Sequence, residues 1–437
     1  MFDILIAGGT LVDGTGAAAH VADVGVRQDR IAAIGDLSEA EAARRIDAAG
    51  WVVAPGFIDA HAHSDAYLLL EPDAPSKLAQ GITTEINGQC GGSAAPRLGR
   101  ARLSSDWASH AYPQRDDASQ TVSRCASAGP TWTTVASYRA LFDAVRPALN
   151  TVQFIGHNTL RAGVMGYEPR AAGPADLQAM CRNLEQALDE GGWGLSTGLL
   201  YQPGKYAEEE EIDALARAAA ARGGMYATHM RSEGGRLTES IDEVLELVRR
   251  TGIRAQLSHL KTSGPANWHK IDAALERIDA ARADGLVVHS DRYPYVAAGT
   301  DLDVVLPDWA SAGGRDAILA NLRDPAARAR IADELNGSGR NWASVMIGGG
   351  WSETVRAFSG RTLADAADAL DLTPGETVCR FVEADETRTG AFFFGMCMEN
   401  LRRIYAQPWV MPGSDASLRA PWGPLGQDHP HPRAYGT

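Results

Sequence analysis

The stretch Phe57-Ile58-Asp59-Ala60-His61-Ala62-His63 decides the predicted fold, because it reads as an apolar strand that ends in polar side chains. Side chains alternate between the two faces of a strand, so Asp59, His61 and His63 share one face. At the carboxyl end of a barrel strand, that face points toward the active site. Two imidazoles at i and i+2 can chelate one metal ion, although a bare pair also fits two surface histidines. The preceding Pro55-Gly56 and the strand context favour metal ligands.

Strand-like and helical patterns alternate along the rest of the chain. The candidate strands are Phe57–Ala60, Thr83–Ile86, Val152–Ile155, Gly194–Thr197, Met225–Thr228, Ala255–Ser258, Val287–Ser290 and Trp409–Gly413. Amphipathic helical patterns lie between them, at Pro174–Glu190, Glu208–Arg222, Arg236–Thr251 and Lys270–Ala283. Strands that alternate with helices in this way predict an α/β fold, a parallel (β/α)8 barrel of the TIM type.

The first 54 residues have a different character. Short strands separated by glycine turns are expected at Ile4–Ala7, Val21–Val26, Ile31–Ile34 and Trp51–Ala54, and Leu37–Arg45 reads as a helical turn. We therefore predict a small β-rich domain over residues 1–54 and a barrel domain over residues 55–437. The stretch from about 317 to 407 is helical in pattern and is expected to be an insertion before the last strand.

Composition narrows the class of protein. A net charge of −14 over 437 residues, without a basic stripe, argues against a nucleic-acid partner. The five cysteines include no CxxC pair, which favours a reducing compartment. The amino terminus lacks the pattern of a signal peptide, and no apolar run is long enough to span a membrane. We expect a cytoplasmic protein whose partner is a small-molecule substrate; the sequence leaves the oligomeric state open.

Further metal-binding side chains occur at the ends of other predicted strands. His229 follows Met225–Thr228, His259 follows Ala255–Ser258, and Asp415 comes soon after Trp409–Gly413. Cys90 lies in the turn after Thr83–Ile86. One histidine at a strand end means little, but this repetition predicts a catalytic zinc site that keeps a position open for water.

These residues also carry a family resemblance that extends over essentially the whole chain. Gly8-Gly-Thr-Leu-Val-Asp-Gly14 and Ala54-Pro-Gly-Phe-Ile-Asp-Ala-His-Ala-His63 resemble the amidohydrolase superfamily. A narrower set of motifs is similar to its D-aminoacylase branch: Gln80–Glu85 with Gly88–Gly91, Ser196–Gly204, Thr228–Gly234, Ser258–Lys261, Arg292–Tyr295, Gly413–Asp415 and His431–Thr437.

The resemblance implies a role for each matching residue. Cys90, His229 and His259 match the ligands of one tight zinc site, and His61 and His63 with Asp415 match a second, weaker metal site. Asp415 also matches the aspartate that handles the proton of the attacking water. Lys261, Tyr293 and Arg433 match a clamp on the α-carboxylate of the substrate, and an arginine can contact a carboxylate through two hydrogen bonds.

The implied activity is zinc-dependent hydrolysis of N-acyl-D-amino acids to a carboxylate and a free D-amino acid. Two alternatives remain: an amidohydrolase reaction on a cyclic amide, of the hydantoinase or dihydropyrimidinase kind, and an inactive barrel with a binding role. The family usually continues well past the motif that ends at Thr437. We therefore expect the small domain to be a β-sandwich-like unit whose C-terminal half is absent from this sequence.

Overall fold

The computed structural model of the chain describes residues 1–101, 132–426 and 429–437, so Cys125 lies outside the described residues. The chain divides into two compact units, Met1–Phe57 and Ile58–Thr437. None of the helices in the described ranges has the length and hydropathy needed to cross a membrane.

The first unit is a five-stranded sheet built around β1 (Phe2–Leu11). β1 pairs antiparallel with β2 (His20–Arg27), which pairs in turn with β3 (Arg30–Gly35). On its other side, β1 pairs in parallel with β4 (Ala42–Asp47) and β5 (Val52–Val53). Its small core consists of the buried Leu11, Ala22 and Val24, with Ile6, Val26 and Val53 packed against them.

The predicted helical turn at Leu37–Arg45 is wrong, because its second half belongs to β4. Alanine, glutamate and arginine favour helices intrinsically, but only weakly. In the sheet, Phe2 pairs with Ala42 and Ala7 with Asp47, so the backbone groups of this segment find partners on β1. Sheet pairing with a distant strand outweighs the local preference.

The second unit contains eight parallel strand positions that form a barrel. One sheet has the order β17-β13-β12-β11-β10-β9 and another the order β6-β7-β8. β8 and β9 are two parts of one strand, interrupted at Phe154, whose N–H still donates to Asn87 O at 2.9 Å. The ring closes between β17 and β6, where Ala60 N donates to Pro412 O at 3.3 Å and Ala62 bridges to Ala416. The bounds are β6 (Phe57–Asp59), β7 (Ile82–Asn87), β8 (Asn150–Gln153), β9 (Ile155–Gly156), β10 (Gly194–Gly198), β11 (Met225–His229), β12 (Arg254–Leu257), β13 (Val288–Arg292) and β17 (Val410–Pro412).

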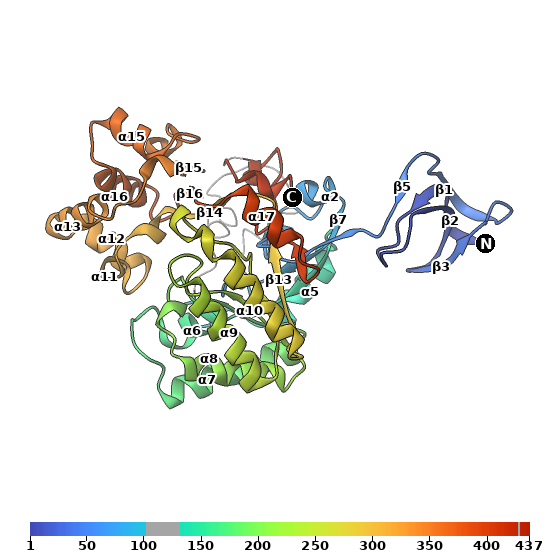
Figure 1. Cartoon of the computed structure of the whole chain (residues 1–437), viewed down its shortest axis with the longest axis horizontal. Helices are drawn as coiled ribbons and strands as arrows, with labels where there is room; N and C mark the ends of the chain where they lie inside the picture. Colours follow the sequence, from blue (N-terminus) through green and yellow to red (C-terminus); the bar gives the residue numbers. More distant parts are fainter. Residues whose placement is uncertain (102–131, 427–428) are drawn as a thin grey trace. The chain divides into compact units, whose positions relative to one another are not determined.

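The barrel helices follow one another around the outside of the strands (Figure 1). In α9 (Leu237–Thr251) the buried residues include Leu237, Ile241, Val244 and Val248, which form one stripe at helical spacing. These side chains join the large core of the unit. The other helices are α1 (Tyr67–Leu70), α2 (Pro75–Leu78), α5 (Val135–Val145), α6 (His157–Met165), α7 (Pro174–Asp189), α8 (Glu209–Ala220), α10 (Ile271–Ala283) and α17 (Met398–Tyr405).

The segment between β13 and α17 has a hydrophobic core of its own, which includes Leu302, Ile331, Val378 and Phe381. Its helices gather in one cluster (Figure 1): α11 (Asp308–Ser311), α12 (Arg315–Arg323), α13 (Pro325–Asn336), α14 (Glu353–Arg356), α15 (Leu363–Leu370) and α16 (Pro374–Ala384). The sequence pattern predicts helices here, but the structure adds an antiparallel sheet with the order β14-β16-β15, formed by Ala297–Asp301, Gly390–Phe394 and Val345–Ile347. This sheet begins well before position 317.

Candidate metal centre and active site

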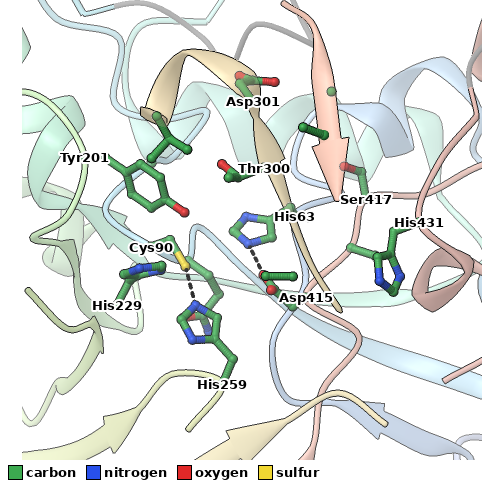
Figure 2. A pocket seen from close by; sticks show the side chains of 18 of the residues that line it. His63, Cys90, Tyr201, His229, His259, Thr300, Asp301, Asp415, Ser417 and His431 are labelled. Carbon is green, nitrogen blue, oxygen red and sulfur yellow. Dashed lines mark hydrogen bonds and ion pairs between the residues drawn. The ribbon is translucent and has the colours of Figure 1, made fainter. Parts of the chain in front are cut away.

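The six residues expected to bind metal converge at the carboxyl ends of the barrel strands. Figure 2 shows five of them: His63, Cys90, His229, His259 and Asp415. His61 and His63 follow β6, Cys90 follows β7, and His229 ends β11. His259 follows β12 and Asp415 follows β17. Parallel strands place all of these ends at one mouth of the barrel, which is why residues far apart in sequence meet there.

Two overlapping groups of potential ligands share Cys90. Group one is Cys90, His229 and His259; group two is His61, His63, Cys90 and Asp415. Within each group, one ligand atom from each residue lies within 4.8 Å of all the others. The Cys90 Sγ lies 3.4 Å from both His61 Nε2 and His259 Nε2, and His63 Nε2 lies 3.0 Å from Asp415 Oδ1.

Three of these residues have a left-handed backbone. The φ angles are 53° at Cys90, 39° at His259 and 50° at Asp415. Residues with a Cβ seldom adopt such angles, and each costs of order 1–3 kcal/mol unless the surrounding structure compensates. The turns after these strands therefore direct the three side chains into the mouth of the barrel, and the backbone conformation that does so costs free energy.

Charge in the site favours ionised ligands. Burial opposes ionisation of Cys90, but the neighbouring His61 and His259 hold the pKa of this thiol well below its ordinary value. Burial likewise disfavours the charged form of Asp415, yet Arg433 and His259 keep the pKa of this carboxyl well below its usual range. A thiolate and a carboxylate are the forms that bind metal.

Group one fits a zinc ion. Both ring nitrogens of His229 are buried and make no hydrogen bond among the described residues, although Nε2 lies 3.7 Å from Glu233 Oε2. A buried imidazole without hydrogen bonds is costly in a protein interior, and a metal ion would satisfy it. Thiolates and imidazoles are both zinc ligands, and a catalytic zinc site takes three protein ligands and leaves the fourth position for water.

The three expected substrate-binding residues line the same cavity, which has a volume of about 730 Å³. Lys261 and Arg433 both lie near the ring of Tyr293, with Lys261 Nζ at 5.7 Å and Arg433 Cζ at 4.8 Å from its centroid. The Tyr293 hydroxyl is buried and has no hydrogen-bond partner in the described part of the chain. Lys261 and Arg433 already have partners, since Lys261 pairs with Glu233 and Arg433 with Asp415.

Three polar residues at the site were not identified from the sequence. Glu233 Oε1 lies 2.8 Å from His259 Nδ1, and Asp291 Oδ2 lies 3.1 Å from His61 Nδ1. Tyr201 directs its hydroxyl toward the space between Cys90 and His63 (Figure 2). Asp291 carried a usable signal, because it is an acid near the end of the seventh predicted strand. Glu233 and Tyr201 lie in loops, where the alternation of side chains along a strand cannot predict which way a side chain points.

A buried ion cluster supports the loop that carries Asp415. Lys77 Nζ lies 2.9 Å from Asp59 Oδ2, from Glu85 Oε1 and from Ser414 Oγ. Asp59 also accepts a hydrogen bond from Ser414 N at 2.7 Å. Ser414, the residue next to Asp415, thus bonds Asp59 of β6 and Lys77 of α2, and Lys77 in turn pairs with Glu85 of β7. These contacts hold the Asp415 carboxylate in position.

The fold and the ligand set together define a metal-dependent hydrolase of the amidohydrolase type. The chain belongs to the amidohydrolase family, whose pattern it matches over residues 44–290. The chain is 37% identical over 435 residues to N-acyl-D-glutamate deacylase of Alcaligenes xylosoxydans xylosoxydans, an alignment that covers 100% of this chain and 76% of the relative. D-aminoacylase of the same organism is 36% identical over 442 residues, covering 100% of this chain and 77% of the relative.

A solved structure shows the same relationship. The crystal structure of N-acyl-D-glutamate deacylase from Bordetella bronchiseptica, in complex with zinc and a phosphonate mimic of the tetrahedral intermediate, is 35% identical in sequence. It superimposes with a TM-score of 0.78 and covers 100% of this chain and 79% of that one. The resemblance to this branch that the motifs indicated is therefore confirmed.

Proposed function

We propose that this chain is a zinc-dependent deacylase, which hydrolyses the amide bond of N-acyl-D-amino acids to a carboxylate and a free D-amino acid. The observation that carries the proposal is the placement of two metal-ligand groups beside Lys261, Tyr293 and Arg433 in one cavity. The identity to deacylases along the whole chain supports this reading, and it supports the D configuration in particular.

Cys90, His229 and His259 would hold the tight zinc ion, and His61, His63 and Asp415, with Cys90, would hold a weaker second ion. Bound zinc polarises a carbonyl and lowers the pKa of water to about 7, which makes water a competent nucleophile. This chain's own residues then have three tasks: to move the proton, to stabilise the developing oxyanion and to orient the substrate.

Asp415 is the proposed proton carrier. It accepts the proton of the attacking water and passes it to the leaving amine nitrogen, so that the C–N bond breaks with a neutral leaving group. Arg433 and His259 keep this carboxyl ionised in spite of its burial, as the acceptor role requires. His63 holds the carboxylate in place through Oδ1.

Tyr201 is the proposed donor to the oxygen of the scissile carbonyl. Burial and the neighbouring Cys90 raise the pKa of its phenol well above the ordinary value, so the hydroxyl keeps its proton. A donor that is already aimed at developing negative charge stabilises the transition state more than the ground state.

Lys261, Tyr293 and Arg433 are the proposed binding site for the α-carboxylate. The amide must lie at the metal ligands and the carboxylate at this clamp, so these two anchors fix two of the four groups on the α-carbon. The hydrogen and the side chain then exchange places between enantiomers, and we expect strong discrimination. Hydantoins and dihydropyrimidines have no free α-carboxylate, so the clamp argues against the cyclic-amide alternative.

The test is incubation of the purified protein and zinc with paired N-acetyl-D- and N-acetyl-L-amino acids, with detection of free amine. We expect release from the D substrates and little from the L substrates. Hydrolysis of hydantoin without hydrolysis of either N-acetyl series would support the cyclic-amide alternative. Absence of both zinc and turnover would support the inactive barrel.

A further inference from the structure

We propose that Glu233 and Asp291 are positioning residues, each of which orients one histidine of a different metal-ligand group. Glu233 would serve His259 in group one, and Asp291 would serve His61 in group two. The inference rests on the proposed metal-dependent function, and it assigns roles to two carboxylates that the mechanism above does not use.

Both histidines point one ring nitrogen at the ligand group and the other at a carboxylate. His259 Nε2 faces Cys90 Sγ at 3.4 Å, while its Nδ1 lies 2.8 Å from both Glu233 Oε1 and Lys261 Nζ. Because Lys261 also donates to Glu233 Oε1, this carboxylate can accept from His259 Nδ1–H and from the ammonium together. His61 Nε2 faces both Cys90 Sγ and Asp415 Oδ1 at 3.4 Å, while its Nδ1 lies 3.1 Å from Asp291 Oδ2. A carboxylate that accepts from Nδ1–H leaves the lone pair on Nε2, so it selects the tautomer that can bind metal.

The two carboxylates differ in their other contacts. Asp291 is fully buried and accepts from Gln256 Nε2 at 2.6 Å and from His259 N at 2.9 Å, so the protein fixes it from three sides. Glu233 lines the cavity and also pairs with Lys261, a residue of the proposed carboxylate clamp. Loss of Glu233 should therefore disturb both the tight metal ion and substrate binding. Loss of Asp291 should act mainly on the second ion, because Asp291 contacts the backbone N–H of His259 and not its ring.

Glutamine and asparagine are the informative replacements, because they keep the size of the side chain. An amide group turned toward Nδ1 can donate a hydrogen bond there, which favours the Nε2–H tautomer that cannot bind metal. Loss of such carboxylate partners typically weakens metal affinity by roughly 10–100-fold. Glu243→Gln is the matched control, since Glu243 pairs with Arg231 and is not a member of either ligand group.

The experiment measures stepwise zinc dissociation constants of the full-length protein by competition with a chelator, together with KM for an N-acetyl-D-amino acid. We expect Glu233→Gln to weaken the first ion by roughly 10–100-fold and to raise KM. Asp291→Asn should weaken the second ion by a similar factor and affect the first ion less, because asparagine keeps the Oδ1 that accepts from His259 N. The Glu243→Gln control should leave both constants within about threefold. The melting temperatures of the metal-free variants should match that of the parent, since a merely structural role would lower them.

Unchanged affinity for the first ion in Glu233→Gln would overturn the inference, as would equal weakening of both ions in the two variants. Either result leaves the proposed function standing, provided that the parent binds zinc through Cys90. A parent protein whose zinc content does not depend on Cys90 would overturn both proposals.

Discussion

The two ligand groups share Cys90 but differ in how their remaining members are held. In group one, the ring of His259 contacts Cys90, Glu233 and Lys261, and His229 Nε2 lies 3.7 Å from Glu233 Oε2. In group two, Asp415 bonds His63 and also pairs with Arg433, so it is linked to the proposed substrate clamp. Under the proposed function, group one would retain the tight ion, whereas group two would include the carboxylate that exchanges protons.

Replacement of the shared ligand should have the largest effect. We expect Cys90→Ala to lose the tightly held zinc ion and all detectable turnover, because it removes a ligand from both groups at once. Elemental analysis of the purified variant checks the metal content. The matched control is Cys181→Ala on α7, which should keep both zinc and activity. Full zinc occupancy in Cys90→Ala would show that the groups are wrongly assigned.

Replacement of Asp415, the proposed proton carrier, should distinguish the roles of the two ligand groups. Asp415→Asn should reduce kcat by roughly 10²–10⁴-fold and keep the tight ion, because an amide cannot accept the proton of water. The backbone should tolerate the change, since asparagine adopts left-handed angles readily. Asp371→Asn is a suitable control, because Asp371 also has a left-handed backbone, with φ of 54°, at the end of α15. If Asp415→Asn turned over within a few-fold of the parent, Asp415 would not be the proton carrier.

A smaller effect is expected at the link between group two and the clamp. Arg433 bonds Asp415 through one terminal nitrogen and Gly299 O through the other, at 2.9 Å. Lysine keeps the charge but has a single nitrogen and cannot make both bonds in this geometry, so Arg433→Lys should raise KM by roughly tenfold or more. Steady-state kinetics with an N-acetyl-D-amino acid and its neutral primary amide check the role. Equal loss for the acid and the amide would mean that Arg433 does not contact the α-carboxylate.

The smallest effect concerns the residue that holds Arg433 in place. His431 accepts from Arg433 N through Nδ1 at 3.1 Å, and burial and the charge of Arg433 lower its pKa to about 4, from 6.5. The unfolded chain therefore binds more protons between those values, and stability should fall as the pH drops from about 6.5 to about 4. His431→Asn keeps an acceptor but does not titrate, so chemical denaturation across this range should show a shallower pH dependence. An unchanged slope would exclude His431 as a source of the acid sensitivity.

Much of the barrel and of the ligand set could be predicted from the sequence, because the alternation of strand-like and helical patterns locates the strands and also the strand ends. All eight predicted barrel strands overlap observed ones, and the polar residue at each strand end then falls at the mouth by geometry alone. His61, Cys90, His229, His259 and Asp415 were found in this way, and the structure brings them together.

What was missed depends on contacts between distant segments. β4 forms because β1 lies beside it, which no local pattern of alanine and arginine reveals. β14 contains alanine and glycine, which are weak strand formers, and β15 has only three residues, too few for a clear alternating pattern. Glu233 acts through His259, a residue 26 positions away in the sequence, and the pairing becomes visible only in space.

The left-handed backbone at Cys90, His259 and Asp415 has a consequence for protein engineering. Glycine adopts such angles without penalty, so a selection for thermal tolerance of the metal-free protein should favour glycine at these three positions. Each such gain would delete a ligand. At these three positions a gain in backbone stability would thus remove the proposed chemistry, so glycine substitutions for stability belong at left-handed residues outside the site, such as Arg146 and Asp371.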